Sequence, residues 1–89
     1  MQERPITIVN KLGLHARAAA KLVTAASSFT SEVELVKDEQ KVNGKSIMGV
    51  MMLAASRGTK LLLLVEGDDE LAAADKLEAL ISDRFGEHE

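Results

Sequence analysis

The spacing of apolar residues changes several times along the chain between the alternation typical of strands and the three- or four-residue repeat of helices. A β-branched run at 6–9 follows the only proline, Pro5, and stops at Asn10, which predicts a first strand. From Ala16 to about Ser28, strong helix formers carry an apolar stripe, which predicts an amphipathic helix. The stripe consists of Ala19, Leu22, Val23 and Ala26.

The middle of the chain predicts a hairpin followed by a short helix. Residues 32–35 alternate polar and apolar side chains, as a strand with one wet face does, and Asp38-Glu39 supplies turn residues. Extended structure resumes at 41–42. After Ser46, apolar residues at helical spacing predict a short helix that is capped by the serine hydroxyl and ends before Arg57.

The last third of the chain predicts a buried strand and a closing helix. Residues 59–66 are apolar for most of their length, which favours a strand between two neighbours over an edge strand. Asp68 or Asp69 then offers a cap to a helix that begins with acidic residues and stops near Gly86. The apolar face of this helix consists of Leu71, Ala74, Leu77, Leu80 and Ile81.

The resulting order of elements, β, α, β, β, α, β, α, predicts an α+β fold, in which helices pack on one face of a mostly antiparallel sheet. A length of 89 residues suffices for one modest core, so we expect a single domain spanning residues 1–89. The chain has no Trp or Tyr and only two Phe, so aliphatic side chains must build that core.

Composition and charge exclude several classes of function. The net charge of −3 is dispersed, which argues against nucleic acid as a partner because phosphate backbones require a clustered basic surface. Without Cys, disulfides and thiolate metal sites are excluded, and we expect no metal. No signal peptide is visible, and the longest apolar run, 61–65, is far shorter than the roughly 20 residues of a membrane span. We therefore expect a cytoplasmic protein without membrane insertion.

The candidate chemistry lies in the segment from Asn10 to Arg17, where His15 and Arg17 stand at the junction between a strand and a helix. Ala16 and Arg17 supply backbone N–H groups of the first helical turn, which lack intrahelical partners and favour an anion. A neutral imidazole is a competent nucleophile toward a phosphoryl donor, and a guanidinium suits phosphate oxygens. Gly13 allows a tight turn into this site.

The spacing alone leaves a plainer interpretation open, in which His15 only caps the helix and Arg17 is a solvated charge. Two segments, 10–23 and 43–49 (Asn43-Gly44-Lys45-Ser46-Ile47-Met48-Gly49), resemble the HPr family of the phosphoenolpyruvate-dependent phosphotransferase system. The resemblance covers essentially the whole chain, because its length, its element order and both motifs fall where the family has them.

The resemblance implies an open-faced β-sandwich, with four antiparallel strands covered on one face by three helices. It implies that His15 accepts a phosphoryl group on Nδ1, that Arg17 stabilises this group and that Ser46 is a regulatory phosphorylation site. The implied partners are Enzyme I as donor, EIIA-type proteins as acceptors and an HPr kinase/phosphorylase at Ser46. The chain would be a carrier rather than an enzyme, hold no cofactor and act as a monomer.

Two departures from the family bear on activity. Ala18 replaces the usual proline after the arginine, and because its N–H lies in the first turn, alanine keeps the helix and adds a donor. Activity should therefore survive. Some sugar-system carriers have further basic residues along the first helix, whereas this chain has only Lys21 there. This favours a nitrogen-related branch slightly over sugar uptake.

A docking surface for partners is expected beside His15, because a short helix leaves part of itself uncovered and methionine adapts to several partners. Its expected members are Leu14, Arg17, Lys21, Ile47, Met48 and Met51. The polar tail at 86–89 carries His88, and we expect this tail to be disordered and His88 not to be a ligand.

Two rival functions remain. One is a regulatory module that binds enzymes or transcription factors through the methionine-rich residues and is switched by phosphorylation at His15 or Ser46. The other is a small phosphate-cleaving enzyme of the acylphosphatase type. Such an enzyme would need a phosphate loop richer in glycine and an asparagine that positions water.

Overall fold

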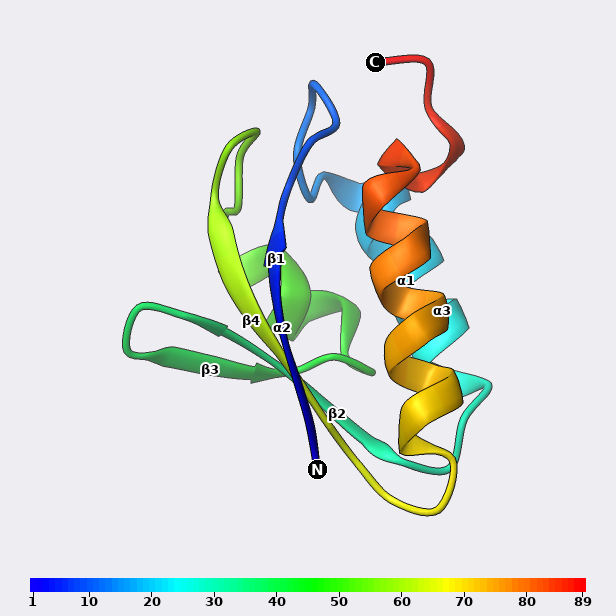
Figure 1. Cartoon of the computed structure of the whole chain (residues 1–89). Helices are drawn as coiled ribbons and strands as arrows, with labels where there is room; N and C mark the ends of the chain where they lie inside the picture. The colour runs from blue at the N-terminus through cyan, green and yellow to red at the C-terminus, as the bar shows by residue number, and fades with distance from the viewer.

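A four-stranded antiparallel sheet forms one layer of the computed structural model, which describes residues 1–89, and helices cover one face of this sheet (Figure 1). The strands lie in the order β1-β4-β2-β3. They are β1 (Gln2–Thr7), β2 (Glu32–Lys37), β3 (Gln40–Asn43) and β4 (Lys60–Glu66). The helices are α1 (Ala16–Ser27), α2 (Ile47–Met52) and α3 (Glu70–Ser82), followed by a 3-10 turn, η1 (Arg84–Gly86). The α+β architecture predicted from the sequence is confirmed.

Strand β4 lies between β1 and β2, as its apolar sequence predicted. Its inward-facing residues, Leu61, Leu63 and Val65, are buried, because helices pack on that face of the sheet. Leu62 and Leu64 face the other way and are half-buried, since no helix covers them. The two faces of β4 therefore differ in burial although both are apolar.

Strand β1 begins and ends earlier than the β-branched run 6–9 predicted. It spans Gln2–Thr7 and includes Pro5, which pairs with Leu62 of β4. Proline is tolerated there because β1 is an edge strand, so one side of its backbone has no neighbour to receive an N–H. Hydrogen bonding with the β4 strand, rather than side-chain type, sets the limits of this element.

The helices bury the faces that their spacing predicted, with one error. In α1 the buried residues are Ala18, Ala19, Leu22, Val23 and Ala26. In α3 they are Ala73, Ala74, Leu77 and Ile81, whereas Leu80 is half-buried. Leu71 was predicted on this face but is 58% exposed. At 3.6 residues per turn it lies about 100° from the centre of the buried face.

Asp69 precedes α3 but does not cap it with its side chain, which corrects the capping prediction. Its carboxylate instead accepts hydrogen bonds from the N–H groups of Thr30 and Ser31, each at 2.9 Å, and from the Ser31 hydroxyl. The side chain therefore ties the start of α3 to the loop between α1 and β2. Ser46, in contrast, caps α2 as predicted, because its hydroxyl accepts from the Gly49 N–H at 3.1 Å.

The core is built almost entirely from aliphatic side chains, as the composition predicted, and Phe85 is the one aromatic residue buried in it. No helix combines the length and the apolar character that crossing a bilayer demands.

Candidate functional site

His15 is the residue directly before α1, and the loop that leads to it is held in place by a hydrogen bond and a close backbone contact. The Leu14 N–H donates to the Ala55 carbonyl oxygen at 2.8 Å. Gly13 has a φ of +67°, and a Cβ atom there would overlap the Ala55 carbonyl oxygen and lie 2.8 Å from Ser56 Cα. Only glycine fits this close approach, so Gly13 and the Leu14 hydrogen bond together fix the position of the backbone that leads into His15.

The first turn of α1 presents backbone donors that have no acceptor. The hydrogen-bond ladder of the helix starts with the Ala19 N–H, which donates to the His15 carbonyl oxygen at 2.8 Å. The N–H groups of Ala16, Arg17 and Ala18 take part in no hydrogen bond within the protein. These three donors lie at the positive end of the helix dipole, where an anion is stabilised.

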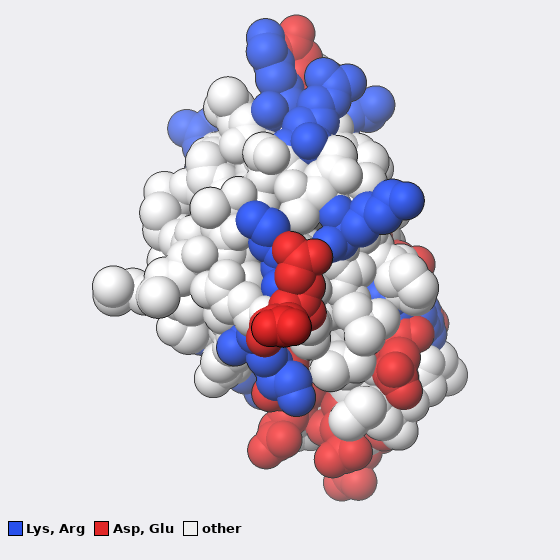
Figure 2. All heavy atoms as spheres, turned by 90° about the vertical axis from the view of Figure 1, so that its left-hand side faces the viewer, with Lys and Arg blue, Asp and Glu red and all other residues white.

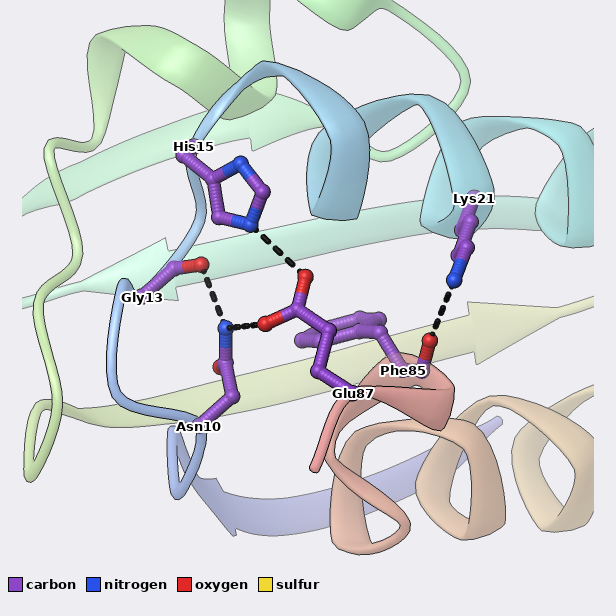
Figure 3. A network of polar contacts seen from close by, with 6 residues as sticks. All are labelled: Asn10, Gly13, His15, Lys21, Phe85 and Glu87. Carbon is purple, nitrogen blue, oxygen red and sulfur yellow. Dashed lines mark hydrogen bonds and ion pairs between the residues drawn. The ribbon is translucent and has the colours of Figure 1, made fainter. Parts of the chain in front are cut away.

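The imidazole of His15 reaches the C-terminal tail rather than its own helix. Its Nε2 lies 2.7 Å from Oε2 of Glu87, and it makes no capping hydrogen bond to α1 (Figure 3). Oε1 of the same carboxylate accepts from Nδ2 of Asn10 at 3.1 Å. The interpretation of His15 as a mere helix cap is therefore wrong.

Asn10 is fully buried, and its Nδ2 also donates to the Gly13 carbonyl oxygen at 2.8 Å. The side chain thus connects the loop before His15 to the tail that contacts His15. The pKa of the Glu87 carboxyl is lowered, chiefly by its hydrogen bond with His15 and further by the one from Asn10. Glu87 is accordingly a carboxylate at neutral pH.

The tail after α3 was predicted to be disordered, and this prediction is wrong. Phe85 is buried in the core and anchors the tail, because a large apolar side chain there removes much surface from water. Its carbonyl oxygen accepts from Nζ of Lys21 at 2.6 Å. Further along, the Lys11 N–H donates to the Glu89 carbonyl oxygen, and the Lys11 ammonium pairs with the Glu89 carboxylate at 3.2 Å.

An open pocket of about 790 Å³ lies over this arrangement. Its lining consists of Lys11, Leu12, His15, Ala16, Arg17, Glu87, His88 and Glu89. His15 is half-buried, with 28% of its side chain exposed, so the ring is held by the protein but open to a partner. Arg17 is exposed and its guanidinium makes no hydrogen bond or ion pair in the protein, which leaves it available to an anion.

Of the residues predicted for the docking surface, those on α2 are exposed, whereas Leu14 is not. Ile47, Met48 and Met51 are 44%, 75% and 42% exposed. Met52, which was not singled out, is 67% exposed, and we call these four residues the methionine patch. Leu14 is only 5% exposed because it packs into the core, so it cannot serve as a contact.

The structure brings together His15, Arg17 and the free amides that the sequence predicted, and it adds Glu87 and Asn10, which the sequence did not predict. Glu87 lies 72 positions from His15 and carried no sequence signal beyond its place in an acidic tail. Asn10 was noted only as the residue where the first strand stops. A polar residue that turns out to be completely buried beside a site is recognisable only once the fold is known.

Comparison with known proteins places the chain beside one family. Residues 2–83 match the family model described as PTS HPr component phosphorylation site. The chain is 54% identical to the phosphocarrier protein HPr of Cupriavidus necator over 100% of both proteins. It is 46% identical to the phosphocarrier protein NPr of Shewanella violacea, covering 96% of this chain and 93% of that protein. The crystal structure of HPr-C-His from Thermoanaerobacter tengcongensis superposes with a TM-score of 0.97, at 50% identity over 100% of both chains.

Proposed function

Since this chain belongs to the HPr family of phosphocarrier proteins of the phosphotransferase system, we propose that His15 is the residue on which it carries the phosphoryl group. One observation carries this proposal. The His15 imidazole, 28% exposed, directly precedes α1, whose first three N–H groups have no acceptor, and it lines the same pocket as the unpaired Arg17. Proteins of this family are carriers rather than independent catalysts, so the acylphosphatase-type alternative is set aside.

Each group of the site has a part in the proposed transfer. The His15 ring attacks the phosphorus of a phosphorylated donor, and the amides of Ala16 and Arg17 stabilise the oxygens of the transferred group. The Arg17 guanidinium binds the same oxygens in the transition state and in the product. We propose Enzyme I as the donor and EIIA-type proteins as the acceptors.

Labelled phosphoenolpyruvate and Enzyme I test the proposal directly. Wild-type protein is expected to take up one acid-labile label per chain, and His15→Ala is expected to take up none although His88 is still present. Arg17→Ala should slow labelling by about 10-fold or more while the chain stays folded, because one charged transition-state contact is lost. Equal labelling of His15→Ala and wild type would refute the assignment.

We further propose the methionine patch as the surface that docks donor and acceptor proteins. It is exposed and apolar, and α2 packs against α1, the helix that begins beside His15. Met48→Lys should raise the KM for Enzyme I and leave the fold intact. Leu71→Lys is the matched control, because Leu71 on α3 is also an exposed apolar residue, at 58% against 75% for Met48. Equal effects of the two substitutions would count against the patch.

Ser46 is proposed as a site of regulatory phosphorylation by an HPr kinase/phosphorylase. The hydroxyl already lies at the start of α2, where added negative charge would be favourable for the helix and repulsive toward an acidic partner. Wild type, but not Ser46→Ala, should be labelled by such a kinase with ATP. Ser46→Asp should then weaken docking of Enzyme I, and a kinase that labels neither protein would contradict the proposal.

The branch of the system is proposed as nitrogen-related. In support, one of the relatives is an NPr protein. In addition, the only basic residue in α1 beyond Arg17 is Lys21, whose ammonium already donates a hydrogen bond to the Phe85 carbonyl oxygen. Phosphorylated protein should therefore pass its label faster to a nitrogen-related EIIA than to a sugar-specific one. Preference for the sugar-specific protein would reverse this assignment.

We expect the relay to operate in the cytoplasm. We also expect one copy of the chain to suffice, because all of the groups named above belong to a single copy. The regulatory-module function is compatible with this relay, since the methionine patch could bind a target in either phosphorylation state. Affinity capture with phosphorylated and unphosphorylated protein would separate the two roles.

A further inference from the structure

The contact between His15 and Glu87 determines which ring nitrogen carries hydrogen. A carboxylate has only acceptor oxygens, so the 2.7 Å contact requires Nε2 of His15 to be the donor. In a neutral imidazole the other nitrogen, Nδ1, then has the free electron pair. The tail residue thus selects one of two tautomers that an isolated ring would interconvert.

The Glu87 carboxylate is itself held from two sides. Asn10 donates to its other oxygen at 3.1 Å, and Asn10 is fully buried and bonded to the Gly13 carbonyl oxygen. Two residues earlier, Phe85 is buried in the core and its carbonyl oxygen is bound by Lys21 (Figure 3). A continuous set of contacts therefore runs from the core to the imidazole, which is how a reactive group is kept in one orientation.

We propose that Glu87 is a positioning residue for phosphoryl transfer, which holds Nε2–H of His15 so that Nδ1 is the nucleophile, with Asn10 fixing the carboxylate. This inference rests on the proposed role of His15 and adds the device that orients it. Glu87 acts through the ring and touches no transferred atom.

The transfer step follows from this arrangement. The Nδ1 electron pair forms the new N–P bond, while the bond from phosphorus to the donor breaks and its electron pair stays with the donor. The proton on Nε2 is retained, so the ring becomes positively charged as the bond forms. The half-buried Glu87 carboxylate compensates that charge, because it lies 2.7 Å from the nitrogen that keeps its proton. Return of the phosphoryl group to an acceptor reverses the same changes.

The decisive experiment compares Glu87→Ala, Glu87→Gln and Asp83→Asn. Asp83 lies in the same C-terminal segment, is exposed and makes no side-chain hydrogen bond or ion pair, so its substitution removes an equal charge without changing the contact with the ring. Two quantities are measured in each folded variant: the rate of labelling by Enzyme I and the tautomer of His15 from its ¹⁵N chemical shifts.

In wild type and in Asp83→Asn, the neutral ring should be almost entirely the Nε2–H tautomer. Glu87→Ala should lower the labelling rate by about 10-fold and give a mixture of tautomers, because the acceptor is gone. Glu87→Gln should keep the Nε2–H tautomer, since its side-chain oxygen still accepts, and restore only part of the rate, since the charge is lost. A role in structure alone would not move the tautomer.

A Glu87→Ala variant that is folded, labels at the wild-type rate and keeps the Nε2–H tautomer would overturn the inference and leave the proposed function intact. Failure of wild type and all variants to label would instead overturn the proposed function. Asn10→Ala is a second probe of the same device. It should lower the labelling rate and give a mixture of His15 tautomers, as Glu87→Ala does. Folding is monitored by circular dichroism because Asn10 is buried.

Discussion

At the scale of single residues, what could be predicted was local chemistry. A histidine, an arginine and a serine next to helical patterns made His15, Arg17 and Ser46 the candidate site residues, because helix starts place donors in a known direction. The contact between Asn10 and Glu87 spans 77 positions and depends on how the tail folds back, which no spacing encodes. Leu14 was misplaced for the converse reason: an apolar residue next to a site is as suited to the core as to a partner.

Gly13→Ala tests how closely the loop before His15 must approach its neighbours. The added Cβ would overlap the Ala55 carbonyl oxygen at a positive φ, so we expect a loss of more than about 1 kcal/mol in the free energy of unfolding. Labelling by Enzyme I should also slow. Gly58→Ala is the control, because φ is +90° there but nothing lies within 4 Å. Urea denaturation of both variants would reveal no difference if the contact were unimportant.

Asp69 predicts how stability responds to acid. The hydrogen bond from the Ser31 hydroxyl, with those from two backbone N–H groups, lowers its pKa from 3.8 to about 2. A carboxyl whose pKa is depressed by folding stabilises the protein above its unfolded pKa and loses this contribution as pH falls toward the folded value. The midpoint temperature of thermal unfolding should therefore decline as the pH is lowered from 3.8 to about 2.

The variant Asp69→Asn separates this carboxyl from the other acidic groups. It should be less stable than wild type at neutral pH and should lose less stability than wild type over the same acid range. Parallel curves for the two proteins would mean that other carboxyls govern the acid response.

At the scale of elements, type was predictable and limits were not. The stripe of α1 and the apolar run of β4 are long enough for periodicity to decide helix or strand. The limits of β1 come from pairing with β4, and the exposure of Leu71 comes from which side of α3 packs on the sheet. Both depend on a neighbour, so they were visible only in the assembled fold.

Ala18→Pro is a test of the first turn of α1. The Ala18 N–H has no partner, so proline removes no helical hydrogen bond, and its rigid ring restricts the unfolded chain. We expect the free energy of unfolding to change by less than about 1 kcal/mol. The rate of labelling should change little, because the Ala16 and Arg17 amides that stabilise the phosphoryl oxygens remain. A clear fall in rate would show that the Ala18 amide also contacts the phosphoryl group, and Ala20→Pro, inside the helix, should unfold the protein.

At the scale of the whole molecule, charge is divided between two ends. Lys and Arg are the main charged side chains at the upper end of Figure 2, whereas Asp and Glu gather at the lower end. Lys11, Arg57 and Arg84 surround one hollow beside the tail, whereas Glu66 at the end of β4 is followed by Asp68 and Asp69 in the turn before α3. A net charge of −3 conceals this separation, which the sequence did not reveal because the cations come from distant segments.

This division predicts a salt-dependent encounter with an anionic phosphorylated donor. The double variant Arg57→Gln/Arg84→Gln should be labelled more slowly than wild type at low salt and equally fast near 1 M salt, where charges are screened within about 3 Å. Lys41→Gln, on the β2–β3 hairpin, removes a cation away from this end and should have little effect. Identical salt dependence in all three proteins would exclude steering by the basic end.

The docked tail also decides how this protein should be handled in the laboratory. The two termini lie at opposite ends of the molecule (Figure 1), with the Met1 ammonium against Glu70 and the last residues beside Lys11. An affinity tag or fluorescent protein fused after Glu89 would be attached two residues from Glu87 and should disturb its contact with the His15 imidazole. A fusion ahead of Met1 lies at the other end of the molecule and should leave that contact unchanged, so assays of the carrier should use it.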